Sequence, residues 1–403
     1  MKPLEGISVI DFTRVLAGPT CTRILAELGA SVIKIEPPSG DLARAGSPTA
    51  GGVAGYFLQL NGGKRNLCID LNWPEAREIV FDLCVKADVV VENFRPGTMA
   101  SFGLHYDALS AANPKIVFVS MSGYGQNSPW FGRPAFATTV QAEAGATATV
   151  LDHYGDNLKH PLNDSSSHAD LYTGLEGAIA ALAGLNQCAR TAKGTHADVS
   201  MMATMLNVNE RLHAQINSMD NEMNEPWALS APDSPMFELA DGSLVTLITS
   251  PVWSPAFSRY CTMMGRNDLR GDARFLTPDL RRQHHDELMT EIRAWMHTFR
   301  TFEELEAQVS GGGGLAVGRV RQPHEALEST WAEVMQPTYS VEVGEHTVRL
   351  PKGPWLFDGQ DSGALTVAAD QGTHNKEILR EVGLDESTIT RLYERGILHG
   401  AQT

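Results

Sequence analysis

The sequence predicts an α/β protein in which a large domain with a parallel sheet is joined to a smaller α+β domain. Two observations support this prediction. Over the first 200 residues, short runs rich in β-branched residues alternate with stretches of helical period. After a segment rich in Asn, Pro, Asp and Ser at 221–235, a hairpin signal and a group of helical patterns replace this alternation. Alternating strands and helices favour a parallel sheet covered by helices on both faces.

The first elements set up this alternation. Residues 7–12 (ISVIDF) predict a strand, and a turn at Gly18-Pro19 leads into a helix at 20–30. The pattern then continues with a strand at 31–37, a helix at 74–87, a strand at 88–93, a helix at 106–114 and a strand at 115–123. Ligands bind at the carboxyl ends of strands in such sheets. The first candidates for a binding site are therefore the loops after Phe12, Glu36, Glu92 and Ser122.

The second half of the chain changes character. A helix rich in small residues is predicted at 170–186, and a strand and a long helix follow it over 195–217. Asp241-Gly242 between two apolar runs predicts a hairpin. The remaining predictions are helices at 254–265, 284–299 and 301–310, strands at 315–320 and 339–350, and two amphipathic helices at 374–384 and 385–398. A helix-start signal at 385–387 precedes the last of these.

Composition narrows the class of protein. The 403 residues suffice for two domains, and 48 acidic against 32 basic residues give a formal net charge of −16. This charge argues against nucleic acid or an anionic membrane as a partner, so an anionic ligand would need a local basic patch. The N-terminal segment has no signal-peptide pattern, and the five scattered cysteines include no C-x-x-C. We therefore expect a cytoplasmic location, without disulfides.

Four cations fall in loops that such a sheet would present to a ligand. Lys64 and Arg65 lie in the segment NGGKRN, and Arg14 and Arg95 each follow a predicted strand. Cations at the carboxyl ends of a sheet indicate a phosphate site. The alternative for each of them is a surface charge paired with a nearby acid. The common nucleotide-binding and hydrolase motifs, such as G-x-G-x-x-G and G-x-S-x-G, are absent from the sequence.

Asp170 begins the small-residue helix and follows the polar run NDSSSHA. A carboxylate at a helix N-terminus is often only an N-cap, so position alone leaves the N-cap and the catalytic interpretations open. His284, His285 and Asp286 are adjacent on a predicted helix and face different sides, so no metal site is predicted. The glycines at 311–314 favour a hinge or turn over an active-site lid.

Taken together, these segments resemble the class III CoA-transferases, also called the CaiB/BaiF family. The resemblance covers almost the entire chain. It is carried by LEGISVIDFTRVLAGPTCTRILAELGASVIKIEPPSGD, YFLQLNGGKRNLCIDL, ADVVVENFRPGTMASFGLHYDAL, NPKIVFVSMSGYGQNSPW, the DLYTG helix start, TAKGTHADVSM and GTHNKEILREVGLDESTITRLYERGIL. Each piece alone is weak, but their shared order is specific.

The resemblance implies the architecture of the whole protein. Residues 1–220 would form a large Rossmann-like CoA-binding domain, with a linker from about residue 205. Residues 221–322 would form the small α+β domain, and residues 323–403 a linker and a C-terminal return to the large domain. Two chains would thread through one another as an interlocked homodimer.

The resemblance also implies the chemistry. Asp170 falls at the family's nucleophile position, where it would form a mixed anhydride and then an aspartyl-CoA thioester. The substrates would be an acyl-CoA donor and a carboxylic acid acceptor, with coenzyme A as a substrate and no permanently bound cofactor. The positions that match the family's CoA contacts are Val15, Leu16, Ala17, the segment Ile69 to Asn72, Asn93, Phe94 and Arg95.

Some positions depart from the family pattern. Phe136 and Ala137 stand where relatives often carry a tyrosine and an acidic residue, and related racemases need a histidine base at the place of Phe136. Racemization is therefore not expected, although a racemase or isomerase and a non-catalytic CoA-binding protein remain the alternatives. The glycine loop of formyl-CoA transferase is not evident within 221–235, and Pro37 replaces a basic residue that can stack on the CoA adenine.

Overall fold

The computed structural model describes residues 2–154, 166–217, 235–312 and 315–400. The chain forms two compact units: Met1–Glu210 together with Gln336–Thr403, and Arg211–Met335. The domain limits expected from the sequence are 1–220, 221–322 and 323–403. The expected linker at 221–235 lies outside the described residues except for Pro235, as do Gly313 and Gly314.

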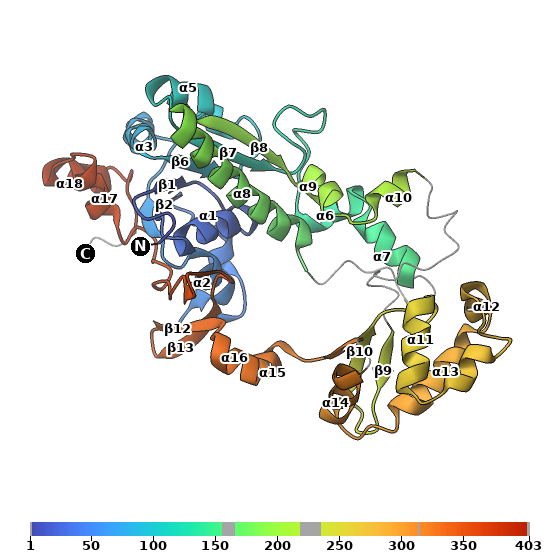
Figure 1. Cartoon of the computed structure of the whole chain (residues 1–403). Coiled ribbons are helices and arrows are strands. Elements are labelled where there is room, and N and C mark those ends of the chain that lie inside the picture. Colours follow the sequence, from blue (N-terminus) through green and yellow to red (C-terminus); the bar gives the residue numbers. More distant parts are fainter. Residues whose placement is uncertain (1, 155–165, 218–234, 313–314, 401–403) are drawn as a thin grey trace. The chain divides into compact units, whose positions relative to one another are not determined.

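A six-stranded parallel sheet forms the centre of the first unit (Figure 1). Its strands are β1 (Ser8–Asp11), β2 (Ser31–Glu36), β5 (Arg65–Cys68), β6 (Val89–Glu92), β7 (Val117–Ser122) and β8 (Thr195–Ser200). They lie in the order β5-β2-β1-β6-β7-β8, so the order reverses between β1 and β6. This is the strand order of doubly wound, Rossmann-like sheets. The predicted α/β class is confirmed, although β5 falls in a segment for which the sequence analysis predicted no strand.

Helices cover both faces of this sheet. The helices α1 (Ala17–Glu27) and α8 (His168–Thr191) pack on one face, and α3 (Pro74–Lys86), α5 (Tyr106–Ala112), α17 (Asn375–Glu381) and α18 (Glu386–Glu394) pack on the other. Neighbouring strand residues alternate between the two cores: Val9 and Val89 face α1 and α8, whereas Ile10 and Val90 face α3. This period of two is the one that strand geometry imposes.

Small residues bring α8 close to α1. A Cβ on Gly174 would lie 2.6 Å from the backbone oxygen of Ala17, and a Cβ on Gly177 would lie 2.6 Å from the Sδ of Met121. Side chains at these two positions would therefore force the helix away from α1 and the sheet. The small-residue pattern of this helix thus fixes the distance between the start of α8, which carries Asp170, and the start of α1.

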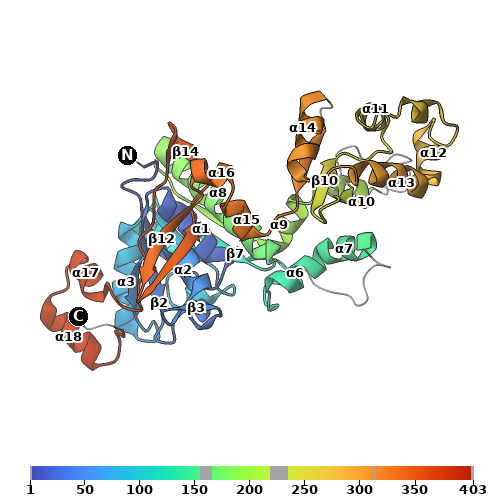
Figure 2. The same cartoon turned by 90° about the horizontal axis from the view of Figure 1, so that it is seen from below.

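The first unit contains further short helices and three two-stranded sheets besides the six-stranded one. They are η1 (Leu42–Ala45), β3 (Thr49–Ala50), β4 (Val53–Ala54), α2 (Gly55–Asn61), α4 (Thr98–Ser101), α6 (Ala137–Glu143), α7 (Ala146–Tyr154), α9 (Met201–Asn207), β12 (Thr338–Val343), β13 (His346–Pro351), β14 (Leu356–Phe357) and β15 (Gln360–Asp361). Figure 2 shows β12 beside α2, and Tyr339 and Val341 share a core with Phe57 and Leu58.

The prediction of one long helix after β8 is wrong, because the chain forms two short helices there, α9 and α10 (Leu212–Ile216). Between them the N–H of Asn209 donates a hydrogen bond to the carbonyl of Leu206, three residues earlier, at 3.4 Å. Asn is a poor helix former because its side chain competes for backbone hydrogen bonds. The two asparagines in LNVN therefore outweigh the helical period on which the prediction rested.

The second unit contains a three-stranded antiparallel sheet covered by helices. Its strands β9 (Met236–Glu238), β10 (Leu244–Ile248) and β11 (Ala316–Arg319) lie in the order β11-β10-β9. The hairpin predicted at Asp241-Gly242 is confirmed, with Gly242 at a φ of 83°. Its helices are α10, α11 (Ser254–Met263), η5 (Asn267–Gly271), α12 (Pro278–Gln283), α13 (His285–Met296), α14 (Phe302–Gly312), α15 (Pro323–Leu327) and α16 (Thr330–Met335). No helix within the described ranges has both the length and the apolarity needed to cross a bilayer.

Candidate active site

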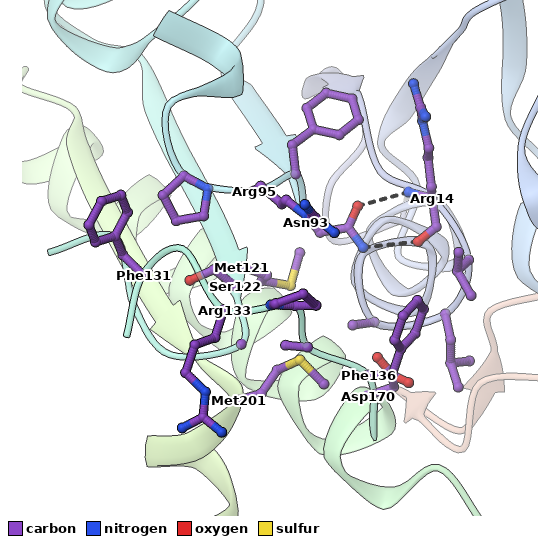
Figure 3. Close-up of a pocket in the computed structure, with 18 residues that line it drawn as sticks. Arg14, Asn93, Arg95, Met121, Ser122, Phe131, Arg133, Phe136, Asp170 and Met201 are labelled. Carbon is purple, nitrogen blue, oxygen red and sulfur yellow. Dashed lines mark hydrogen bonds between the residues drawn. The ribbon is translucent and has the colours of Figure 1, made fainter. Parts of the chain in front are cut away.

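A cavity of about 200 Å³ lies at the carboxyl ends of β1, β6 and β7, where the strand order reverses (Figure 3). Three of the four loops predicted as ligand-binding contribute to it, namely those after Phe12, Glu92 and Ser122. The residues that line it are Arg14, Val15, Leu16, Ala17, Asn93, Phe94, Arg95, Pro96, Met121, Ser122, Gly123, Phe131, Arg133, Pro134, Ala135, Phe136, Asp170 and Met201. The structure thus brings Asp170 together with seven of the predicted CoA-contact residues.

The loop between β1 and α1 is held in an unusual conformation. Val15 has a φ of 65°, a left-handed value that is rare for a β-branched residue. Its N–H donates to Oδ1 of Asp41 at 3.0 Å, and the Nζ of Lys34 donates to the Thr13 carbonyl at 2.7 Å. Lys34 and Asp41 are themselves a buried ion pair at 3.0 Å. The loop is therefore fixed from beneath by buried charged groups.

Arg14 presents its guanidinium at the same place. The guanidinium lies over the ring of Phe94, 4.9 Å from the ring centroid, in the geometry of a cation–π contact. Burial lowers the pKa of Arg14, and the nearby carboxylates of Asp41 and Glu36 oppose this shift. Its buried Nε atom has no hydrogen-bond partner among the residues that the structure describes. The Nε–H of Arg14 is therefore a donor that the described part of the chain leaves unused.

Asp170 is the carboxylate of this cavity. It lies in the first turn of α8, as the third residue of the helix, and the N-cap is Ser167. The interpretation of Asp170 as a helix N-cap is therefore wrong. Burial raises the pKa of Asp170 to about 6, because desolvation disfavours the charged form. A half-buried carboxylate at the head of a helix, open to a cavity, is suited to nucleophilic chemistry.

Tyr56 is a neighbour of Asp170 that the sequence analysis missed. Burial and the negative charge of Asp170 raise the pKa of Tyr56 to about 12, so its phenol stays protonated at neutral pH. Tyr56 lies in α2, far from residue 170 in the sequence, and no local motif connects the two. Arg133 was also missed; its guanidinium lies between the rings of Tyr124 and Trp130 and pairs with Glu143.

Two of the predicted phosphate cations, Lys64 and Arg65, do not line the cavity of Asp170. The Nζ of Lys64 is buried and donates to Asp11 at 3.0 Å, and also to Thr22 and Asn61. Burial lowers its pKa to about 8, against the opposing attraction of Asp11. Arg65 pairs with Glu377 and Glu381 of α17. Lys64 thus neutralises a buried acid, and Arg65 forms surface ion pairs between β5 and α17.

The predicted contacts Ile69 and Asn72 line a second, smaller cavity. It has a volume of about 130 Å³ and is lined by Phe12, Arg14, Ile35, Pro37, Ile69, Asp70, Leu71, Asn72, Phe94 and Phe102. Arg14 and Phe94 line both cavities. The predicted residues thus form two groups that meet at these two side chains.

The doubly wound strand order and a carboxylate in the cavity at its point of reversal are typical of α/β enzymes of the Rossmann-like class. A sequence profile of the CoA-transferase family III matches residues 4–375. The chain therefore belongs to this family of enzymes, which use CoA thioesters as substrates.

Curated and solved relatives agree with this assignment. Succinyl-CoA:glutarate CoA-transferase of Mus musculus is 30% identical over the whole of this chain and 92% of its own length. Succinyl-CoA:mesaconate CoA-transferase of Haloarcula marismortui is 34% identical over 96% of this chain and 98% of its own. A CaiB/BaiF family protein from Brucella suis matches the structure with a TM-score of 0.77 and 26% identity, over 94% of this chain and 99% of that one.

Proposed function

We propose that this enzyme moves CoA from an acyl-CoA to a free carboxylic acid through covalent intermediates on Asp170. The observation that carries the proposal is the position of Asp170, which lies half-buried in a cavity whose walls include the loops 14–17 and 93–96. These loops match the family's CoA contacts. The nucleophile and the thioester would therefore meet in the same cavity.

The chemistry balances without a further reactant. A carboxylate oxygen of Asp170 attacks the thioester carbonyl and expels CoA thiolate, which leaves a mixed anhydride. The thiolate attacks the aspartyl carbonyl, releases the donor acid and forms an aspartyl-CoA thioester. The acceptor carboxylate attacks this thioester and expels the thiolate again, and the thiolate then takes the acyl group from the second anhydride. The product is the new acyl-CoA, and Asp170 is regenerated.

Two features of the site support these steps. The first turn of α1, with Ala17 in the cavity wall, presents backbone N–H groups and the positive end of the helix dipole to the oxyanions that form. The buried apolar side chains of Met121 and Met201 line the cavity, and a bound acyl-CoA would have to exclude the water that would hydrolyse both intermediates.

The two cavities suggest the path of CoA. The adenosine end would occupy the smaller cavity, between Pro37 and Ile69, and the thioester would lie in the larger one beside Asp170. Because Arg14 and Phe94 line both, the phosphates would pass the Arg14 guanidinium. Pro37 offers an apolar surface to the adenine in place of a cation.

We further propose a homodimer. Leu171, Leu175 and Ile179 form a stripe at a spacing of four residues on α8, and they are 37%, 45% and 58% exposed. A stripe of this kind on the helix that carries Asp170 is unusual for a surface facing water. A second copy of the chain would cover it, as in the interlocked dimer that the family resemblance implies.

Mass spectrometry tests the nucleophile directly. The enzyme is incubated with succinyl-CoA and a panel of acids that includes glutarate and mesaconate, which the names of its relatives suggest, and the peptide with Asp170 is examined for a CoA-sized adduct. The wild type should carry the adduct, and Asp170→Asn should lose both the adduct and the transfer, whereas Asp82→Asn, at an exposed site on α3, should retain both.

Other results would favour other functions. Transfer at a normal rate in Asp170→Asn would exclude Asp170 as the nucleophile. Exchange of the α-proton for deuterium without an acceptor acid would indicate an isomerase, which the phenyl ring of Phe136 in the cavity wall disfavours because it cannot act as a base. Binding of CoA without any exchange would indicate a binding protein.

A further inference from the structure

The side chain of Asn93 is bound on both sides by the backbone of a single residue. Its Oδ1 accepts the N–H of Arg14 at 2.8 Å, and its Nδ2 donates to the carbonyl of Arg14 at 2.9 Å (Figure 3). The amide thus pairs with Arg14 as a neighbouring strand would. The plane of the Asn93 amide is fixed by this pairing.

The loop that Asn93 bonds, residues 13–17, has a strained backbone that needs hydrogen bonds to hold it. The next residue, Val15, adopts a left-handed backbone conformation that a β-branched side chain disfavours. The hydrogen bond from the Val15 N–H to Asp41 holds one side of the loop, and Asn93 holds the residue before it. Without Asn93, the backbone of Arg14 would lose the contact that orders it from the side of β6.

The loop in turn places a side chain that faces both cavities. The guanidinium of Arg14 lies over Phe94, the residue after Asn93. The loop of Arg14 and the segment after β6 are therefore joined by this contact as well as by the Asn93 hydrogen bonds. Glu92, the residue before Asn93, accepts the Phe94 N–H at 2.8 Å and orders the same turn. The segment 92–94 therefore contacts the Arg14 loop through both backbone and side chain.

We infer that Asn93 is a positioning residue, which holds Arg14 and its loop in the conformation that acyl-CoA binding requires, and that it does not act by contacting CoA itself. The inference rests on the proposed function for the identity of the ligand. It reassigns Asn93, which the family resemblance places among the CoA contacts.

The test compares Asn93→Ala with a matched control. Asn113 makes a similar set of bonds at the opposite end of the sheet: its Nδ2 donates to the carbonyls of Val85 and Ala87 at 3.0 and 3.1 Å, and its Oδ1 accepts the Lys115 N–H. Asn93→Ala should weaken CoA binding, measured by calorimetry, and raise KM for the acyl-CoA about tenfold, with kcat within about twofold. Asn113→Ala should change neither value.

A double-mutant cycle with Arg14→Ala separates positioning from contact. If Asn93 acts through Arg14, the Asn93→Ala change should cost much less CoA affinity when Arg14 is already Ala. Equal losses in both backgrounds, with no change in the hydrogen exchange of residues 13–17, would overturn the inference and assign Asn93 a contact of its own.

Hydrogen exchange provides a readout that needs no ligand. Peptides covering residues 13–17 should exchange faster in Asn93→Ala than in the wild type or in Asn113→Ala. Unchanged exchange, or unchanged CoA affinity despite faster exchange, would overturn the inference and leave the proposed function intact. Absence of CoA binding by the wild type would count against the proposed function, whatever Asn93→Ala does to exchange.

Discussion

Glu92 ends β6 and lies buried beneath the turn that carries Phe94. Burial raises the pKa of Glu92 from 4.5 to about 7. Hydrogen bonds from Ser120 and the Phe94 N–H oppose the shift, and the charge of Asp198 adds to it. On the same side, His196 of β8 lies 2.9 Å from the Ser120 hydroxyl, and burial lowers the pKa of His196. Of these groups, Glu92 should therefore dominate titration near neutral pH.

The sign of the effect on stability follows from linkage. Between the unfolded pKa near 4.5 and the folded pKa near 7, the folded chain binds one more proton than the unfolded chain, so stability falls as pH rises. The shift corresponds to about 3 kcal/mol, since one pKa unit is about 1.4 kcal/mol. This stability is fully present below pH 4.5 and is lost above about pH 7. Glu92→Gln cannot ionise and should lack this dependence.

The measurement is the thermal midpoint of the wild type and Glu92→Gln between pH 4.5 and 8. The Tm of the variant should rise relative to the wild type by about 5 °C across this range, from the entropy of unfolding expected for a unit of this size. Glu78→Gln, at an exposed position on α3, is the control and should show no such trend. A constant Tm difference between Glu92→Gln and the wild type would refute an elevated pKa at Glu92.

Three further outcomes are expected. Transfer should decline as pH falls through about 6, because the nucleophile must be ionised and burial raises the pKa of Asp170; a kcat/KM profile that stays flat between pH 5 and 7 would contradict this. Gly174→Ala should lower stability by about 1 to 3 kcal/mol and slow adduct formation, since its Cβ would meet the Ala17 oxygen, and both Tm and mass spectrometry report it. Lys64→Met should cost about 3 to 5 kcal/mol because it leaves Asp11 buried without its cation; a wild-type Tm would show that the pair is not needed.

The fold of the large unit could be predicted because its signals are local. Apolar runs such as 7–12 and 115–123 are too short for helices, and the helical stretches between them carry clear ends. The α8 helix was predicted from its small residues, and the structure shows why they are needed. A Cβ added at Gly174 or Gly177 would lie only 2.6 Å from a neighbouring atom. The strand β5 could not be predicted in the same way. Its four residues, RNLC, include two polar side chains, and their burial depends on the C-terminal segment that packs beside them.

The site was predictable only in part for a similar reason. Arg14 and Arg95 follow strand ends in the sequence, and both line the cavity. Lys64 also lies in a loop, but its side chain turns inward and pairs with the buried Asp11. A sequence shows where the cations are along the chain. It does not show which carboxylate each cation will pair with in the folded protein. Tyr56 illustrates the same limit, because only the folded chain brings α2 near Asp170.

The distribution of paired carboxylates resolves the apparent conflict between a net charge of −16 and an anionic substrate. Two acids that hold the backbone of the loop at Thr13 and Val15 are neutralised in place: Asp11 pairs with Lys64 and Asp41 with Lys34, each at 3.0 Å in the protein interior. These cations therefore contribute indirectly, because they cancel charges that would repel a phosphate. The field at the mouth of the cavity is then set by the arginines that line it, of which Arg14 retains an unpartnered donor within the described part of the chain. Attraction of a CoA thioester depends on this local balance, because interactions with exposed charges more than about 8 Å away are largely screened at physiological salt.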